Sequence, residues 1–123
     1  MSWMYSAKQN ESEVGGIECL IVFEDGSTKV LDNLGYHSPD GFQIGYGGSG
    51  PADLAYSILM DYMLRSKEFE MNGVPGKTEF MHQHFKRSFV AVAKKNLEID
   101  SESIKEWIEK FAEKANEDLR GIK

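Results

Sequence analysis

The stretch GYGGSGPADLAYSIL, residues 45–59, decides the fold. It holds four glycines in six residues, followed by Pro51, whose fixed φ and missing N–H suit the first turn of a helix. Beyond Pro51 the apolar side chains recur at helical spacing, at Leu54, Ala55, Ile58, Leu59 and Tyr62. Before the glycines, Phe42 and Ile44 alternate with Gln43, as in a short strand. The stretch therefore predicts a strand, a glycine loop and a helix.

The glycine loop has two interpretations. A loop of this kind presents free backbone N–H groups at the positive end of a helix, which favours binding of an anion. Lys86 and Arg87 of a later predicted helix would be the natural cationic contributors to such a site. Alternatively, the glycines only make a tight turn that lets the helix pack closely against the sheet. Both interpretations stay open at the level of the sequence.

Two catalytic motifs fit the glycine loop incompletely. Gly45, Gly47 and Gly50 have the G-x-G-x-x-G spacing of dinucleotide-binding proteins, but such a unit needs a parallel strand directly after the helix, and residues 66–73 are polar. Ser49 lacks the glycine that a nucleophile elbow requires two positions later, because Pro51 stands there. We therefore expect no catalytic residue here, and we expect the Ser49 hydroxyl to cap the helix.

Metal and cofactor sites are not expected. His82 and His84 are two residues apart on a predicted helix and so face in opposite directions, whereas two ligands on one helix need a spacing of three or four. Cys19 alternates with apolar residues of a strand and is expected to be a buried small hydrophobe.

Composition predicts one soluble domain spanning residues 1–123. The chain has 41% hydrophobic and 28% charged residues, and no apolar run approaches the roughly 20 residues that cross a bilayer. A single cysteine agrees with a reducing compartment, so we expect a cytoplasmic protein and no membrane partner.

The net charge of −6 is unevenly distributed. Residues 1–50 hold seven acids against Lys8 and Lys29, a balance of −5, and residues 51–123 hold thirteen acids against twelve bases. An acidic protein is a poor binder of nucleic-acid phosphate, so no direct nucleic-acid partner is expected. It can dock on a basic protein surface, including one that itself binds nucleic acid.

The order of the elements predicts an α+β fold. Strands are expected at residues 3–7, 17–23, 28–31 and 42–46, with a hairpin turn at Asp25-Gly26. Helices are expected at residues 51–65, at 79–96 and from 101 to 121, the last capped by Asp100 or Ser101. Residues 97–99 are expected to be a connector with at most one or two strand residues. The result is a single small domain in which three helices pack on one face of an antiparallel sheet of three to four strands.

A family resemblance appears at residues 37–55, where HSPDGFQIGYGGSGPADLA resembles the signature of the DUF6166-like family, uncharacterised small proteins of bacteria and phages. HQHFK at residues 82–86 resembles its second block, and Ile104 with Trp107 its third. The resemblance implies one small domain, frequently in a phage or mobile element, and brings no established activity. The candidate ligand-binding or partner-binding residues are Tyr46, Gly47, Gly48, Ser49, Gly50, Asp53, Gln83, Lys86 and Arg87.

Three functions are weighed from these features, and the last of them is an enzyme, which an acid or a histidine buried beside the glycine loop would favour. The first is a non-enzymatic phage or mobile-element protein that inhibits a host defence protein, as an anti-CRISPR protein does, through its acidic surface. The alternative is a module that binds a small anion or a nucleotide signal at residues 45–50. Apolar faces on three helices exceed what one small sheet covers, which also leaves room for a homodimer.

Overall fold

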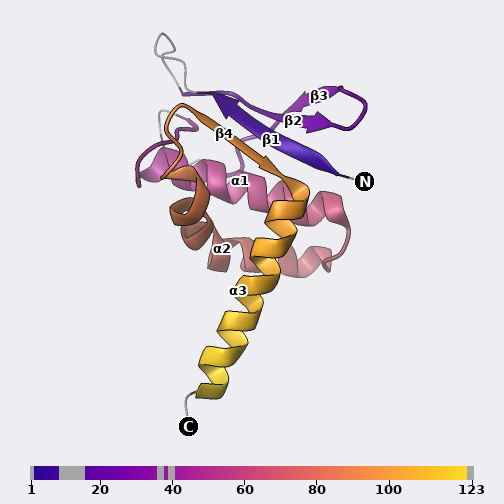
Figure 1. Ribbon diagram of the computed structural model, residues 1–123, viewed down its shortest axis with the longest axis vertical. Helices are drawn as coiled ribbons and strands as arrows, with labels where there is room; N and C mark the ends of the chain where they lie inside the picture. The colour runs from indigo at the N-terminus through magenta and orange to yellow at the C-terminus, as the bar shows by residue number, and fades with distance from the viewer. Residues whose placement is uncertain (1, 9–15, 36–37, 39–40, 122–123) are drawn as a thin grey trace.

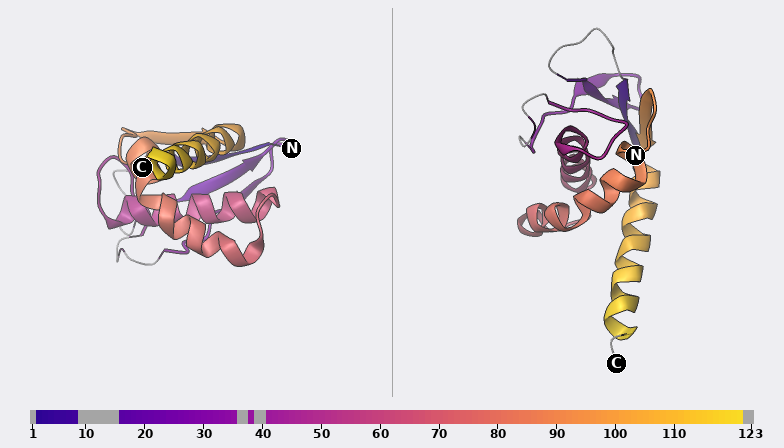
Figure 2. Two further views of the ribbon diagram at one scale, coloured as in Figure 1. Left: turned by 90° about the horizontal axis from the view of Figure 1, so that it is seen from below. Right: turned by 90° about the vertical axis from the view of Figure 1, so that its left-hand side faces the viewer.

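A four-stranded antiparallel sheet forms one layer of the protein, and the helices lie on one side of it (Figures 1 and 2). The computed structural model describes residues 2–8, 16–35, 38 and 41–121, with side chains up to residue 115. The strands are β1 (Trp3–Lys8), β2 (Cys19–Phe23), β3 (Thr28–Val30) and β4 (Asn96–Asp100), in the spatial order β3-β2-β1-β4. The α+β class expected from the sequence is confirmed.

The register of the strands places one apolar face toward the helices. Tyr5 lies between Ile21 of β2 and Ile99 of β4, and all three side chains are buried. Ala7 lies in the same way between Cys19 and Leu97. The Cys19 side chain is fully buried as expected, and this burial raises the pKa of its thiol to about 12. The alternation of apolar and polar residues in the sequence therefore correctly predicted which side chains of the strands face the helices.

The hairpin between β2 and β3 turns at Asp25-Gly26, as expected. Gly26 has a φ of +88°, and its N–H donates to the Phe23 carbonyl at 3.0 Å. The side chain of Asp25 accepts hydrogen bonds from the N–H and the hydroxyl of Ser27, which closes the turn.

Helix α1 (Ser49–Ser66) lies against the inner face of the sheet and packs on its other side against α2. Eleven of its eighteen residues are buried, among them Leu54, Ile58 and Leu59, so most of its circumference is apolar. The helix begins two residues before Pro51. The expected cap by Ser49 is wrong, because Gly48 is the N-cap residue and no side chain caps it.

The second helix differs from its expected bounds. A short 3₁₀ turn (η1, Met71–Gly73) leads into α2 (Val74–Phe85), which begins five residues before the expected start because Pro75 and Gly76 are accommodated in its first turn. The helix ends in a π-helical turn (η2, Lys86–Val90), closed by a hydrogen bond from Ala91 N–H to the Lys86 carbonyl at 2.8 Å. Val92, two residues beyond this turn, is 65% exposed.

The fourth strand comes from a different part of the chain than expected. Residues 42–46 form no strand, although Phe42 and Ile44 are buried as their alternation suggests. The place beside β1 is taken by β4, which follows the π-turn, and its Leu97 and Ile99 complete the inner face. The alternation of apolar residues thus predicted correctly that these positions are buried. It did not predict which segment forms the fourth strand.

Helix α3 (Ser101–Gly121) starts directly after β4. Asp100 caps it, accepting a hydrogen bond from Ser103 N–H at 2.7 Å. Ile104 and Ile108 are buried against the domain, and the C-terminal half of the helix extends beyond the rest of the described residues (Figures 1 and 2). Among the described residues, no helix is both long and apolar enough to cross a membrane.

Candidate functional site

The glycine loop and helix α2 frame a pocket of about 470 Å³, which we call the glycine-loop pocket. One wall comes from the loop and the first turn of α1, and the other from α2 and the start of the π-turn. The lining residues are Gly47, Gly48, Ser49, Ala52, Glu79, His82, Gln83 and Lys86. Segments more than thirty residues apart in the chain thus meet at one concave site.

The wall from α2 is built by helical periodicity. Glu79, His82, Gln83 and Lys86 are spaced i, i+3, i+4 and i+7 and therefore lie on one face. His82 is buried, and its Nδ1 lies 3.0 Å from the Glu79 carbonyl oxygen, while its Nε2 lies 3.3 Å from Gln83 Nε2. Both ring nitrogens of His82 thus have a partner within the protein. The ring of Tyr56 packs edge-on against His82.

Lys86 is the most unusual residue of the pocket. Only 8% of it is exposed, and its ammonium donates to the carbonyl of Gly47 at 3.2 Å. Within the described part of the chain, no carboxylate comes within ion-pair distance of this ammonium. Its only partner there is therefore a neutral oxygen. Lys86 is also the first residue of the π-turn, a geometry that is frequent at functional sites.

The loop is held in place by its own close contacts. A side chain at Gly50 would place its Cβ 2.5 Å from Gln43 Oε1, and one at Gly48 would meet the ring of Tyr46 at 2.3 Å. Gly45 N–H donates to the Val90 carbonyl at 3.0 Å, which ties the loop to the π-turn. Gly47 is different, because a Cβ there would meet nothing within 4 Å. Close packing explains Gly48 and Gly50, whereas the missing side chain of Gly47 keeps the pocket open.

The start of α1 adds a backbone donor to the pocket. The first hydrogen bond of this helix runs from Ala52 N–H to the Gly48 carbonyl at 3.1 Å, and Pro51 has no N–H. The N–H group of Ser49, which lines the pocket, precedes that bond at the end of the helix that carries partial positive charge. The glycine-loop pocket therefore combines a buried ammonium with the positive end of an 18-residue helix.

The structure brings together five of the nine residues predicted for a site, namely Gly47, Gly48, Ser49, Gln83 and Lys86. The other four do not line the pocket. Tyr46 is half exposed and its hydroxyl donates to Gln43 Oε1, Gly50 packs against Gln43, and Arg87 is exposed. Asp53 is fully buried, and its Oδ2 accepts a hydrogen bond from Ser38 N–H at 2.7 Å. Asp53 thus anchors the connector before the loop.

Three lining residues were missed by the sequence analysis: Ala52, Glu79 and His82. The two from α2 carried a signal, because they continue the helical spacing of Gln83 and Lys86 by one turn. Glu79 is exposed and is the one acidic side chain among the lining residues. In the described ranges, no group of three side chains of the metal-ligating kinds converges. The side chains of the glycine-loop pocket thus offer the Lys86 ammonium and the Gln83 amide as donors and the Glu79 carboxylate as an acceptor.

Comparison with known proteins identifies the family. The chain belongs to the family of unknown function DUF6166, whose model matches residues 10–110 and so covers most of the sequence. No curated protein and no solved structure matches it. The recognition of the family is confirmed.

Proposed function

We propose that this protein is a binding module that captures a small anionic ligand, such as the phosphate groups of a nucleotide, in the glycine-loop pocket. The observation that carries the proposal is Lys86, a residue only 8% exposed whose ammonium has one neutral partner among the described residues. The helix end and the Gln83 amide lie on the same pocket and supply further donors.

The free-energy cost of burying the charge of Lys86 favours a pocket that holds an anion over an empty pocket. Burying a charged group without an opposite charge costs several kcal/mol, although the group can recover part of this through hydrogen bonds. An ammonium has three N–H donors, and one carbonyl satisfies one of them. A bound phosphate oxygen would satisfy the others and neutralise the charge. Charge-assisted hydrogen bonds of this kind are about twice as strong as neutral ones.

The test is thermal denaturation of the full chain with pyrophosphate and with ADP as probes. A ligand at 100 times its Kd stabilises the folded state by about 2.7 kcal/mol. We expect Lys86→Met to abolish the ligand-induced shift, because methionine keeps the length of the side chain and removes the charge. Lys94→Met is the matched control, since Lys94 is exposed and lies outside the pocket. Equal shifts in wild type and Lys86→Met would overturn the proposal.

Two further variants distinguish binding in the glycine-loop pocket from a general effect of the charge of the protein. Gly47→Val fills open space without a clash at its Cβ, so it should leave the fold intact and block the ligand. Glu79→Gln removes the one acid among the lining residues and should tighten pyrophosphate binding. Weaker binding in Glu79→Gln would contradict capture of an anion at this wall.

A second candidate function is supported by the separation of charge between the layers. The described residues of the sheet layer (2–8, 16–35 and 96–100) carry six acids, all exposed, against Lys8 and Lys29, a balance of −4. Residues 41–95, which form α1, α2 and the π-turn, carry five acids against seven bases, a balance of +2. This distribution supports docking of the sheet layer on a basic protein. Inhibition of a host defence protein in a phage setting would be one form of such docking.

Capture of a partner from host lysate at low and high salt tests this candidate. Binding through the acidic layer should weaken as salt rises. The double variant Glu18→Gln with Glu98→Gln should weaken capture, while Glu113→Gln on the far part of α3 serves as the control. Capture that neither salt nor the double variant changes would rule out docking through this layer.

A further inference from the structure

A second and larger pocket lies at the end of the sheet where β1 begins. It has a volume of about 930 Å³ and is lined by four segments: the start of β1, the turn between β2 and β3, the C-terminal end of α1 and the first turn of α3. We call it the sheet-end pocket. Its size falls in the upper part of the range of small-molecule sites, about 300–1,000 Å³. None of the residues predicted for a site lies in it.

Three aromatic side chains line this pocket: Trp3, Phe23 and Tyr62. The rings of Trp3 and Tyr62 lie 5.7 Å apart with an interplanar angle of 33°, and the guanidinium of Arg65 lies 5.2 Å from the centre of the Phe23 ring. Aromatic rings at a partly open surface offer a face on which a flat apolar group can stack.

A buried hydrogen-bond network holds two of the lining residues in place. Trp3 Nε1 donates to the Tyr5 hydroxyl at 2.9 Å, and this hydroxyl donates to Asp61 Oδ2 at 2.5 Å. Asp61 in turn accepts from Arg65 Nε and Nη2, each at 3.0 Å. Tyr5 is fully buried, so the orientation of the Trp3 ring and of the Arg65 guanidinium is fixed from inside the domain. A pocket whose lining is held by such a supporting network is preorganised for a ligand.

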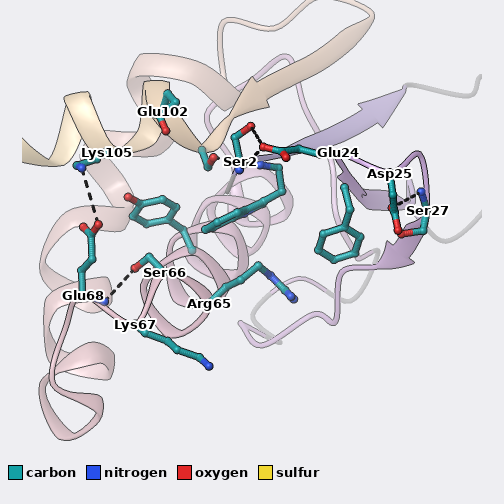
Figure 3. A pocket seen from close by; sticks show the side chains of 14 residues that line it. Ser2, Glu24, Asp25, Ser27, Arg65, Ser66, Lys67, Glu68, Glu102 and Lys105 are labelled. Carbon is teal, nitrogen blue, oxygen red and sulfur yellow. Dashed lines mark hydrogen bonds and ion pairs between the residues drawn. The ribbon is translucent and has the colours of Figure 1, made fainter.

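The pocket is lined by charges of both signs. In Figure 3, Glu24 and Glu102 lie along one side, and Arg65 and Lys67 lie along the opposite side. Lys105, on the side of Glu102, forms an ion pair at 3.7 Å with Glu68 of the opposite side, so these two charges offset each other. The Glu24 carboxylate accepts hydrogen bonds from the N–H and the hydroxyl of Ser2 at 2.7 and 2.8 Å, which lowers its pKa and keeps it ionised. Lys67 is the one residue other than glycine with a positive φ in the described chain, at 58°, where it ends α1.

We propose that the sheet-end pocket binds a small zwitterion with a flat apolar body, the chemical class of the aromatic amino acids. The ammonium group would face Glu24 and Glu102, the carboxylate would face Arg65 and Lys67, and the ring would stack on Trp3. A ligand with charge of one sign would meet repulsion on one of the two sides. A zwitterion matches both, which is the complementarity that gives specificity.

The experiment follows the two tryptophan indole N–H signals of the ¹⁵N-labelled full chain during titration with L-phenylalanine. Trp3 lines the pocket, while Trp107 donates to Ser88 on another part of the molecule and serves as the internal control. Trp107→Phe assigns the two signals. We expect L-phenylalanine to shift the Trp3 signal and to leave the Trp107 signal in place.

Matched ligands and variants test the role of each charge. N-acetyl-phenylalanine lacks the ammonium and phenylalanine amide lacks the carboxylate, and each should bind at least fivefold more weakly than L-phenylalanine. Glu102→Gln should weaken L-phenylalanine and strengthen the anionic N-acetyl-phenylalanine, whereas Lys67→Gln should weaken L-phenylalanine and strengthen the cationic amide. Glu106→Gln, outside the pocket, is the control. No shift at Trp3 up to the solubility limit, or equal affinity for all three compounds, would overturn the proposal.

Discussion

The two pockets contain cations in opposite electrostatic situations. In the glycine-loop pocket the Lys86 ammonium is buried with one neutral carbonyl as its described partner. In the sheet-end pocket the Arg65 guanidinium makes two hydrogen bonds to the Asp61 carboxylate, which is itself held by Tyr5. A cation with a carboxylate partner stabilises the fold, whereas a buried cation without one costs stability until an anion arrives. The free energy of unfolding therefore distinguishes the two sites.

Removing the carboxylate of the sheet-end pocket should have the largest effect. We expect Asp61→Asn to lower the free energy of unfolding by about 2–3 kcal/mol, because it leaves the partly buried Arg65 without its counter-charge and weakens the hydrogen bond from Tyr5. Urea denaturation followed by circular dichroism measures the change.

The control is a pair with the same spacing on the surface. Glu106 and Lys110 are also four residues apart, at 2.9 Å, but their side chains are 67% and 72% exposed. Glu106→Gln should hardly change the urea midpoint, because exposed ion pairs contribute little. If Asp61→Asn and Glu106→Gln had the same effect, the network around Tyr5 would have no special role.

The sheet-end pocket should also make stability depend on pH in the alkaline range. Burial, followed by the nearby carboxylates of Glu68, Glu102 and Glu109, raises the pKa of Tyr62 to about 12 from its ordinary value of 10.0. The unfolded chain loses this proton first, so the contribution of Tyr62 is fully present below pH 10 and is lost as the pH rises toward 12. Urea midpoints between pH 9 and 11 should fall less in Tyr62→Phe than in wild type.

Removing the cation of the glycine-loop pocket should have the opposite sign and a smaller size. We expect Lys86→Met to raise the free energy of unfolding of the ligand-free protein by about 1 kcal/mol, because an apolar side chain of similar length replaces a buried charge. The same urea denaturation measures it, with Lys94→Met as the exposed control. A loss of stability in Lys86→Met would show that its hydrogen bond to Gly47 already compensates its burial, and the contrast between the two pockets would disappear.

Much of the glycine-loop pocket followed from the sequence because its residues belong to local patterns. The loop is marked by its glycines, and Gln83 and Lys86 lie on one face of a helix whose periodicity is visible in the sequence. Asp53 and Arg87, also candidates from the sequence, do not line this pocket. Asp53 turns away to bind the backbone of Ser38, and Arg87 is exposed. Neighbours in sequence point to different sides of a helix, and only its packing decides which side meets the loop.

The sheet-end pocket could not be found in the same way. Its lining residues come from four segments with no shared motif, and Trp3 and Arg65 are joined only through Tyr5 and Asp61. The pairing of β4 with β1 brings the start of α3 to this end of the sheet. The expected strand at residues 42–46 would have placed a different segment beside the sheet.

The sequence by itself determined the α+β class, the inner face of the sheet, the helix after the glycine loop and the family to which the chain belongs, because these depend on alternation, helical spacing and turn residues that act over a few positions. Tertiary structure alone decided which segment became the fourth strand, that Lys86 is buried beside the loop, and that four distant segments form the larger pocket. Contacts between distant segments depend on how whole faces pack together, and local patterns leave that packing undetermined.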